Sequence, residues 1–166
     1  SSENLTGEKS NEGSCVCNSP LFLKYQKNSQ LFYYLCTMIR YYENIDISES
    51  TGNVTNYASA SENIIIKTST GNIRVENLSA NTLDLSASTG EVTVSNVTCE
   101  GDVKINVSTG KTNLTNIECK NVVSNGNTGA ISLKNVIAAD KFSIERSTGD
   151  VKFDGCDAAE IFVETD

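Results

Sequence analysis

The stretch Ser-Thr-Gly-Glu-Val-Thr-Val-Ser-Asn-Val, at positions 88–97, decides the fold because its features return along most of the chain. Six Thr-Gly pairs follow one another at intervals of 19 or 20 residues, and Thr6-Gly7 lies outside this register. Ser precedes the pair in five copies, and Asn127 replaces it in the sixth. The six pairs consist of Thr51, Gly52, Thr70, Gly71, Thr89, Gly90, Thr109, Gly110, Thr128, Gly129, Thr148 and Gly149. A fixed period of this length is typical of a repeat architecture.

Apolar residues keep nearly the same distance from the Gly in each copy and lie two positions apart. Around Gly90 they are Leu83 and Leu85 before it and Val92 and Val94 after it. Alternation with a period of two predicts strands, whereas a helix needs apolar residues three and four apart. Equivalent positions can then stack as parallel ladders about 4.8 Å apart. We therefore predict an all-β fold, a single-stranded β-solenoid (β-helix) of about six coils of 19–20 residues.

Two ladders of turn residues are expected at the corners of each coil. The Gly of each pair directly precedes a strand, where a positive φ is often needed, and the Ser and Thr hydroxyls can bond the backbone there. A second corner is expected six residues after the Gly, because Asn tolerates left-handed geometry and can hydrogen-bond along a stack. This Asn ladder comprises Asn77, Asn96, Asn116 and Asn135, with Gly155 in the next copy. Both ladders are predicted to be structural.

Composition narrows the possible functions. The 166 residues include no His and carry a net charge of −8. The missing His removes the commonest general base, and the acidic residues do not cluster, so we expect no enzyme, no catalytic residue and no cofactor. An acidic surface repels nucleic acid, so no nucleic-acid partner is expected. The most apolar stretch, residues 31–39, is far shorter than the roughly twenty residues of a membrane span.

The six cysteines predict no metal site, because none is spaced C-x2-C and no His accompanies them. Cys99 and Cys119 both lie nine residues after their Gly, where other copies have Ala, so they should stack in neighbouring coils. A disulfide between them is one interpretation, and two small buried side chains is the one we favour. Cys15 and Cys17 are expected to be exposed.

The chain divides into residues 44–166, the solenoid repeat domain, and residues 1–43, which do not follow the repeat. Residues 21–42 are rich in aromatics, and we expect them to cap the first coil as a helix or an extra strand pair. A partner-binding amphipathic segment is the alternative. Residues 1–18 are expected to be loose.

The order of strand, Ser-Thr-Gly, Val/Ile-x-Val/Leu and x-Asn-Val/Leu, from about Ile45 to Asp166, resembles a bacterial family of domains of unknown function that carries an adhesin label. The resemblance implies a right-handed β-helix in an extracytoplasmic, cell-surface or cell-envelope setting. It also implies an adhesin-like binding or scaffold function, with a protein or glycan of the envelope or host surface as partner. It supplies no catalytic residues.

Two other functions fit a β-solenoid. A carbohydrate-active enzyme of the lyase or hydrolase type needs acidic or basic side chains that converge from adjacent coils. Ice binding needs a flat periodic array of Thr, whereas the Thr ladder here lies at a bend between Ser and Gly. We expect the ladder to be a turn element.

Overall fold

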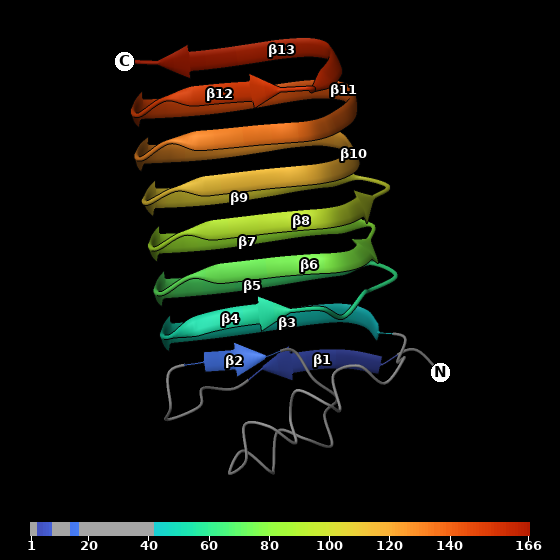
Figure 1. Ribbon diagram of the computed structural model, residues 1–166. Helices are drawn as coiled ribbons and strands as arrows, with labels where there is room; N and C mark the ends of the chain where they lie inside the picture. The colour runs from blue at the N-terminus through green and yellow to red at the C-terminus, as the bar shows by residue number, and fades with distance from the viewer. Residues whose placement is uncertain (1–2, 8–13, 17–41) are drawn as a thin grey trace.

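The structure is a computed structural model, and it describes residues 3–7, 14–16 and 42–166. These residues form thirteen strands of one sheet that winds into a stack, with no helix among them (Figure 1). The predicted β-solenoid of about six coils is confirmed. Within the same residues, no helix is available that could cross a bilayer.

The strands differ in length because some continue through a corner. In chain order they are β1 (Glu3–Gly7), β2 (Ser14–Val16), β3 (Tyr42–Thr51), β4 (Asn53–Asn56), β5 (Asn63–Thr70), β6 (Ile73–Ala80), β7 (Thr82–Thr89), β8 (Val92–Cys99), β9 (Asp102–Thr109), β10 (Thr112–Thr128), β11 (Ile131–Thr148), β12 (Val151–Asp154) and β13 (Asp157–Thr165). We number the coils 1 to 6 by the glycines from Gly52 to Gly149. The strands β10 and β11 each supply the end of one coil and the start of the next.

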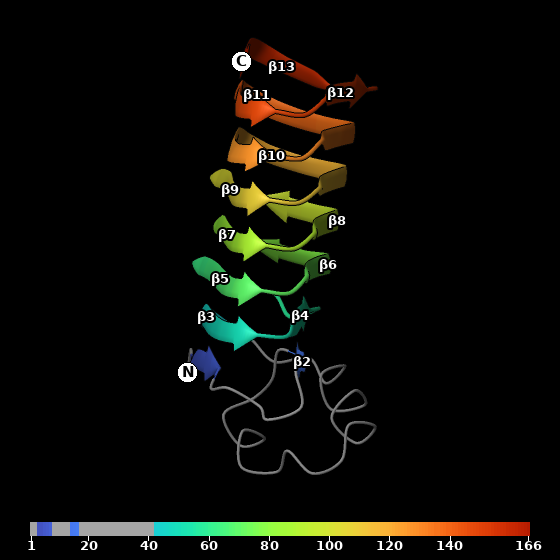
Figure 2. The same ribbon diagram turned by 90° about the vertical axis from the view of Figure 1, so that its left-hand side faces the viewer.

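Every coil has one face before its Gly and one face after it, and both faces form parallel ladders (Figure 2). The register follows the repeat, so that Leu83 pairs with Val103 before the Gly and Val92 pairs with Thr112 after it. Equivalent residues therefore lie directly above one another along the stack. This arrangement turns each repeated position into a straight column of side chains.

The core is the space between the two faces. Leu83, Leu85, Val92 and Val94 of one coil are completely buried there, and equivalent residues of the other coils continue the same columns. Burying an aliphatic side chain contributes about 1.5–3 kcal/mol. Because the coils above and below cover each apolar layer, the stack is stable where a single coil would not be.

Two short strands lie against the first coil. β1 pairs with β3 and places Leu5 beside Ile45, and β2 pairs with β4 and places Cys15 beside Val54. Both strands fall within residues 1–18, so the expectation that this segment is loose is wrong at these positions. The aromatic stretch expected to cap the first coil lies outside the described residues, apart from Tyr42.

Candidate functional site

The first corner of each coil turns at the Gly of the repeated pair. The six glycines have φ between 131° and 152°, a region that residues with a side chain rarely adopt. The backbones also approach each other closely, because a Cβ on Gly71 would collide with the carbonyl oxygen of Gly52. The N–H of Gly71 donates to the carbonyl of Thr89 in the next coil at 2.9 Å. Conformation and lack of space therefore both require Gly here.

The side-chain hydroxyls of the repeated tripeptides face solvent, whereas that of the neighbouring Thr68 donates to the carbonyl oxygen of Gly52 at 3.4 Å. Within the described part of the chain, no hydrogen bond involves the side-chain hydroxyl of a tripeptide Ser or Thr, and all of these side chains are exposed. We expected such hydroxyls to bond the backbone at the bend, but the bend groups pair between coils instead. The hydroxyls are left facing solvent in two columns.

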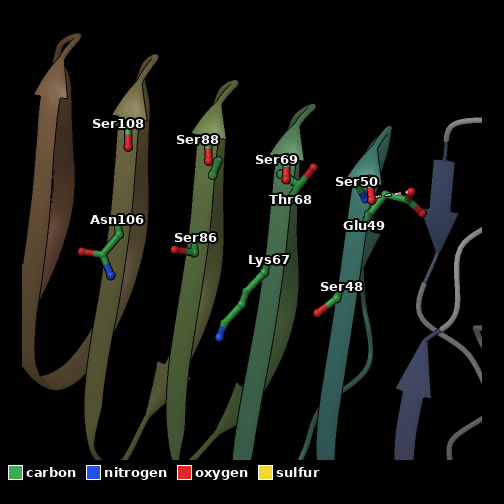
Figure 3. A pocket seen from close by; sticks show the side chains of 11 residues that line it. Ser48, Glu49, Ser50, Lys67, Thr68, Ser69, Ser86, Ser88, Asn106 and Ser108 are labelled. Atoms are coloured by element: carbon green, nitrogen blue, oxygen red, sulfur yellow. Dashed lines mark hydrogen bonds between the residues drawn. The ribbon is translucent and has the colours of Figure 1, made fainter.

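Beside this corner lies a shallow groove of about 430 Å³, which we call the serine groove. It crosses β3, β5, β7 and β9, and two rows of outward side chains run along it (Figure 3). The rows hold the residues two and four positions before the Gly, in register from coil to coil. The groove is lined by Ser48, Glu49, Ser50, Lys67, Thr68, Ser69, Ser86, Ala87, Ser88, Asn106 and Ser108.

The chemistry of the serine groove is that of a hydrogen-bonding surface. Each hydroxyl can donate one hydrogen bond and accept others, and Asn106 adds an amide. Lys67 supplies an exposed ammonium. The Glu49 side chain is only 5% exposed, and its Oε1 accepts from the backbone N–H of Ser50 at 3.1 Å and of Thr51 at 3.4 Å. This carboxylate therefore stabilises the bend at one end of the groove.

The second corner of each coil is built around Asn. Asn77, Asn96, Asn116 and Asn135 have φ between 51° and 56°, the left-handed region. Their exposed amides form a ladder, in which Nδ2 of each Asn donates to Oδ1 of the Asn in the preceding coil at 2.9 to 3.2 Å. Gly155, with φ 62°, occupies the same position in coil 6 and ends the ladder. The Asn side chains thus connect four coils on the surface.

The two stacked cysteines lie just inside the second corner. Cys99 pairs with Ala80 below it, and Cys119 pairs with Ala138 above it. Both thiols are free and buried. Burial raises the pKa of Cys99 to about 11 and that of Cys119 to about 12. A buried thiol that keeps its proton is a poor nucleophile, so the pair has the properties of small core residues.

A buried polar cluster that the sequence reasoning missed lies in coils 4 to 6. Arg146 is only 4% exposed, and its guanidinium points along the axis into the core. Nη2 donates to Oγ of Ser124 at 2.9 Å and to Oγ1 of Thr112 at 3.4 Å. Gly126 provides the room, because a Cβ there would collide with Nη1 of Arg146. Three coils are thereby joined through one side chain.

This cluster is electrostatically unusual for a core. No carboxylate pairs with Arg146 among the described residues, and its Nε has no hydrogen-bond partner there. Burial lowers the pKa of the guanidinium, since the charged form loses hydration. The sequence indicates this cluster only because Ser124 and Thr112 occupy repeat positions that are apolar in the other coils. The cluster links coils 4 to 6 through hydrogen bonds in the core and does not form a solvent-accessible site.

The remaining acidic residues do not form a metal centre in the described part of the chain, where no group of three or more His, Cys, Asp or Glu could hold a metal ion. The serine groove is thus the surface with the best-defined chemistry.

Comparison with known proteins places the whole solenoid in one family. The family model described as Toastrack DUF4097 matches residues 4–165. A search of curated proteins and of solved structures found no match. The matched range includes β2 and all of β1 except its first residue, as well as the six coils.

Proposed function

We propose that this chain, which belongs to the Toastrack family of domains of unknown function, is a non-catalytic binding module that contacts its ligand through the serine groove. The ligand class is a glycan of the cell envelope or host surface, and the setting is extracytoplasmic. This gives the chain an adhesin-like role in which the solenoid is a rigid scaffold.

One observation carries the proposal: a row of four Ser hydroxyls and a second row of Ser48, Lys67, Ser86 and Asn106 face solvent on rigid strands, and the hydrogen bonds among the described residues do not use these side chains. Hydroxyls held on a rigid scaffold lose little conformational freedom on binding, which favours affinity. A polyhydroxylated ligand can exchange several hydrogen bonds with such rows, since each Ser is both donor and acceptor. Lys67, the cationic side chain among the described lining residues, adds preference for a glycan that bears an anionic group.

The groove chemistry supports binding without turnover. Glycoside hydrolysis commonly uses a pair of carboxyl groups on either side of the scissile bond. Among the described residues that line the serine groove the only carboxylate is that of Glu49, and it is buried and bonded to the bend. The negative charge of the chain also disfavours nucleic acid as the ligand.

A glycan array followed by calorimetry tests the proposal. We expect the chain to bind a subset of glycans, and Ser69→Arg and Ser88→Arg, which fill the groove, to weaken binding about tenfold or more. Ser79→Arg is the matched control, because Ser79 is exposed on the face after the Gly and should leave affinity unchanged.

Two results would contradict the proposal. Groove variants that bind as tightly as the unmodified chain would exclude the serine groove, and a chain that binds no glycan would exclude the ligand class. The bound glycan should also be recovered intact by mass spectrometry. Cleavage products would favour the carbohydrate-active enzyme instead.

A further inference from the structure

The serine groove repeats itself along the axis of the solenoid. Its first row holds the same residue at the same position of coils 1 to 4, namely Ser50, Ser69, Ser88 and Ser108 (Figure 3). The residues around these serines pair in register between β3, β5, β7 and β9, so the four hydroxyls form a column. Neighbouring strands lie about 4.8 Å apart. The groove therefore offers the same hydroxyl four times at that interval.

Across the strands the serine groove is narrow. The second row lies two residues earlier on each strand, about 6.6 Å from the first row. The next outward position along the strands includes Ile65 and Asp84, and neither of these described residues lines the groove. An elongated ligand therefore meets further hydrogen-bonding groups along the solenoid axis and not along a strand.

A ligand that uses all four coils must itself repeat at nearly the same interval. In an extended polysaccharide with equatorial linkages, one sugar ring advances the chain by close to the spacing of two neighbouring coils. Each ring carries hydroxyls on both of its edges, and these can face both rows of the groove. A glycan with axial linkages curves away from a straight column, and a single terminal sugar reaches one or two coils. The groove thus matches a linear, extended glycan.

The charge of the serine groove limits how acidic such a glycan can be. Lys67, in coil 2, is exposed and forms no ion pair among the described residues. The chain as a whole carries a net charge of −8, which repels a polyanion. A glycan with a carboxylate on every ring is therefore disfavoured, whereas one anionic group near coil 2 can pair with Lys67.

We infer, on the basis of the proposed glycan binding, that the serine groove holds a linear, equatorially linked polysaccharide parallel to the solenoid axis. One sugar ring lies over each of coils 1 to 4. The hydroxyls of each ring exchange hydrogen bonds with the Ser of the first row and with the side chain of the second row in the same coil. The ring over coil 2 is the place for an anionic group, beside Lys67.

Calorimetry with oligosaccharides of two to six rings tests the inference. Cello-oligosaccharides and chito-oligosaccharides are the probes, because their β-1,4 linkages keep the chain extended. We expect the affinity for at least one of these series to rise about threefold or more with each added ring. The rise should stop at four rings, the length of the groove. Malto-oligosaccharides, which curve because of their α-1,4 linkages, should gain no affinity beyond two rings.

Blocking variants locate the rings along the groove. Ser108→Arg closes coil 4 and should lower the affinity for a four-ring chain to about that for a three-ring chain. Ser88→Arg closes coil 3 and should lower it further, to about that for a two-ring chain. Ser147→Arg is the matched control, since Ser147 holds the same row in coil 6 and does not line the serine groove. Thermal unfolding of all three variants separates a blocked groove from a folding defect.

A charged probe tests the position of the anionic group. Cellotetraose with one inner ring oxidised to glucuronic acid should bind about threefold more tightly than cellotetraose at low salt. The preference should disappear in Lys67→Ala and at high salt. Equal affinity of the unmodified chain for the two tetrasaccharides would remove the role assigned to Lys67.

Three results would overturn the axial arrangement. They are an affinity that does not grow with length in either β-linked series, equal gains with the curved malto-oligosaccharides, and no binding of either β-linked series. A branched or terminal sugar bound on the glycan array would in each case leave the proposed function standing. A chain that binds no glycan at all would remove both.

Discussion

Neighbouring coils are held together by different groups at the two corners. At the first corner the backbones of neighbouring coils approach so closely that only Gly fits, and the stack is held by backbone hydrogen bonds. At the second corner the backbone turns with φ near 50°, which leaves room for a side chain, and the stack is held by the amides of Asn. The first corner is thus fixed by sterics and the second by side-chain bonding. Substitutions at the two corners should differ accordingly.

The largest loss of stability is expected from a substitution at the first corner. Gly110→Ala should destabilise the chain by about 3 kcal/mol or more, because the φ of 144° is strained for Ala and the Cβ meets the Gly90 carbonyl. Chemical denaturation measures the free energy of unfolding. The neighbouring Lys111→Ala, an exposed change, should stay within about 0.5 kcal/mol of the unmodified chain. Equal effects of the two variants would show that the corner is not sterically closed.

A smaller effect is expected at the second corner. Asn96→Ala should lower the free energy of unfolding by about 1–2 kcal/mol, since Ala is less suited to the left-handed region. The variant also loses the amide bonds to Asn77 and Asn116. Asn125→Ala, an exposed change with φ outside that region, serves as the control. A loss as large as that of Gly110→Ala would remove the distinction between the corners.

The buried thiols just inside the second corner should make the stability of the chain depend on pH. Well below pH 9.0 both Cys99 and Cys119 are protonated in the folded and the unfolded chain, so they add no pH dependence there. Above that pH the unfolded thiols ionise, while burial holds the folded pKa values at about 11 and about 12. Stability should therefore fall as pH rises from 9.0 toward these values.

Denaturation curves across this pH range check the prediction. The double variant Cys99→Ala, Cys119→Ala should show a shallower loss, because Ala already occupies the same position in other coils. An identical slope in the variant would mean that other groups cause the loss.

The smallest effect is expected where the Asn ladder ends. Gly155 has φ 62°, and a Cβ there would meet the end of the Asn135 side chain, which can move. Gly155→Asn should therefore change the free energy of unfolding by no more than about 0.5 kcal/mol, and its amide can extend the ladder. Thermal unfolding checks this, and a large loss of stability would show that the second corner also excludes side chains.

The sequence was sufficient for the solenoid because every coil repeats the same inward and corner positions. It was insufficient for β1 and β2, because residues 17–41 interrupt the period: Leu5 pairs with Ile45 across two periods of the repeat. It was also insufficient for Arg146, whose long side chain reaches Ser124 and Thr112 in the coils beneath. Periodicity identifies which face a residue lies on and not how far its side chain extends.

Periodicity was also insufficient to predict the serine groove on the outer surface. The tripeptide Ser was recognised as a corner residue, but the row two positions earlier, with Ser48, Lys67, Ser86 and Asn106, has no hydropathy signal. Only the register of the strands shows that the two rows run side by side over four coils. The groove could therefore be identified only after the stacking of the coils was known.

The most direct test of the account asks whether equivalent positions lie in adjacent coils. In a background without the native cysteines, Ser69→Cys with Ser88→Cys should form a disulfide on mild oxidation, because adjacent coils are about 4.8 Å apart. Ser69→Cys with Ser108→Cys lies two coils apart, roughly 10 Å, and should not. Mass spectrometry distinguishes the two forms. Crosslinking of the distant pair but not of the adjacent pair would contradict the stack and the serine groove built on it.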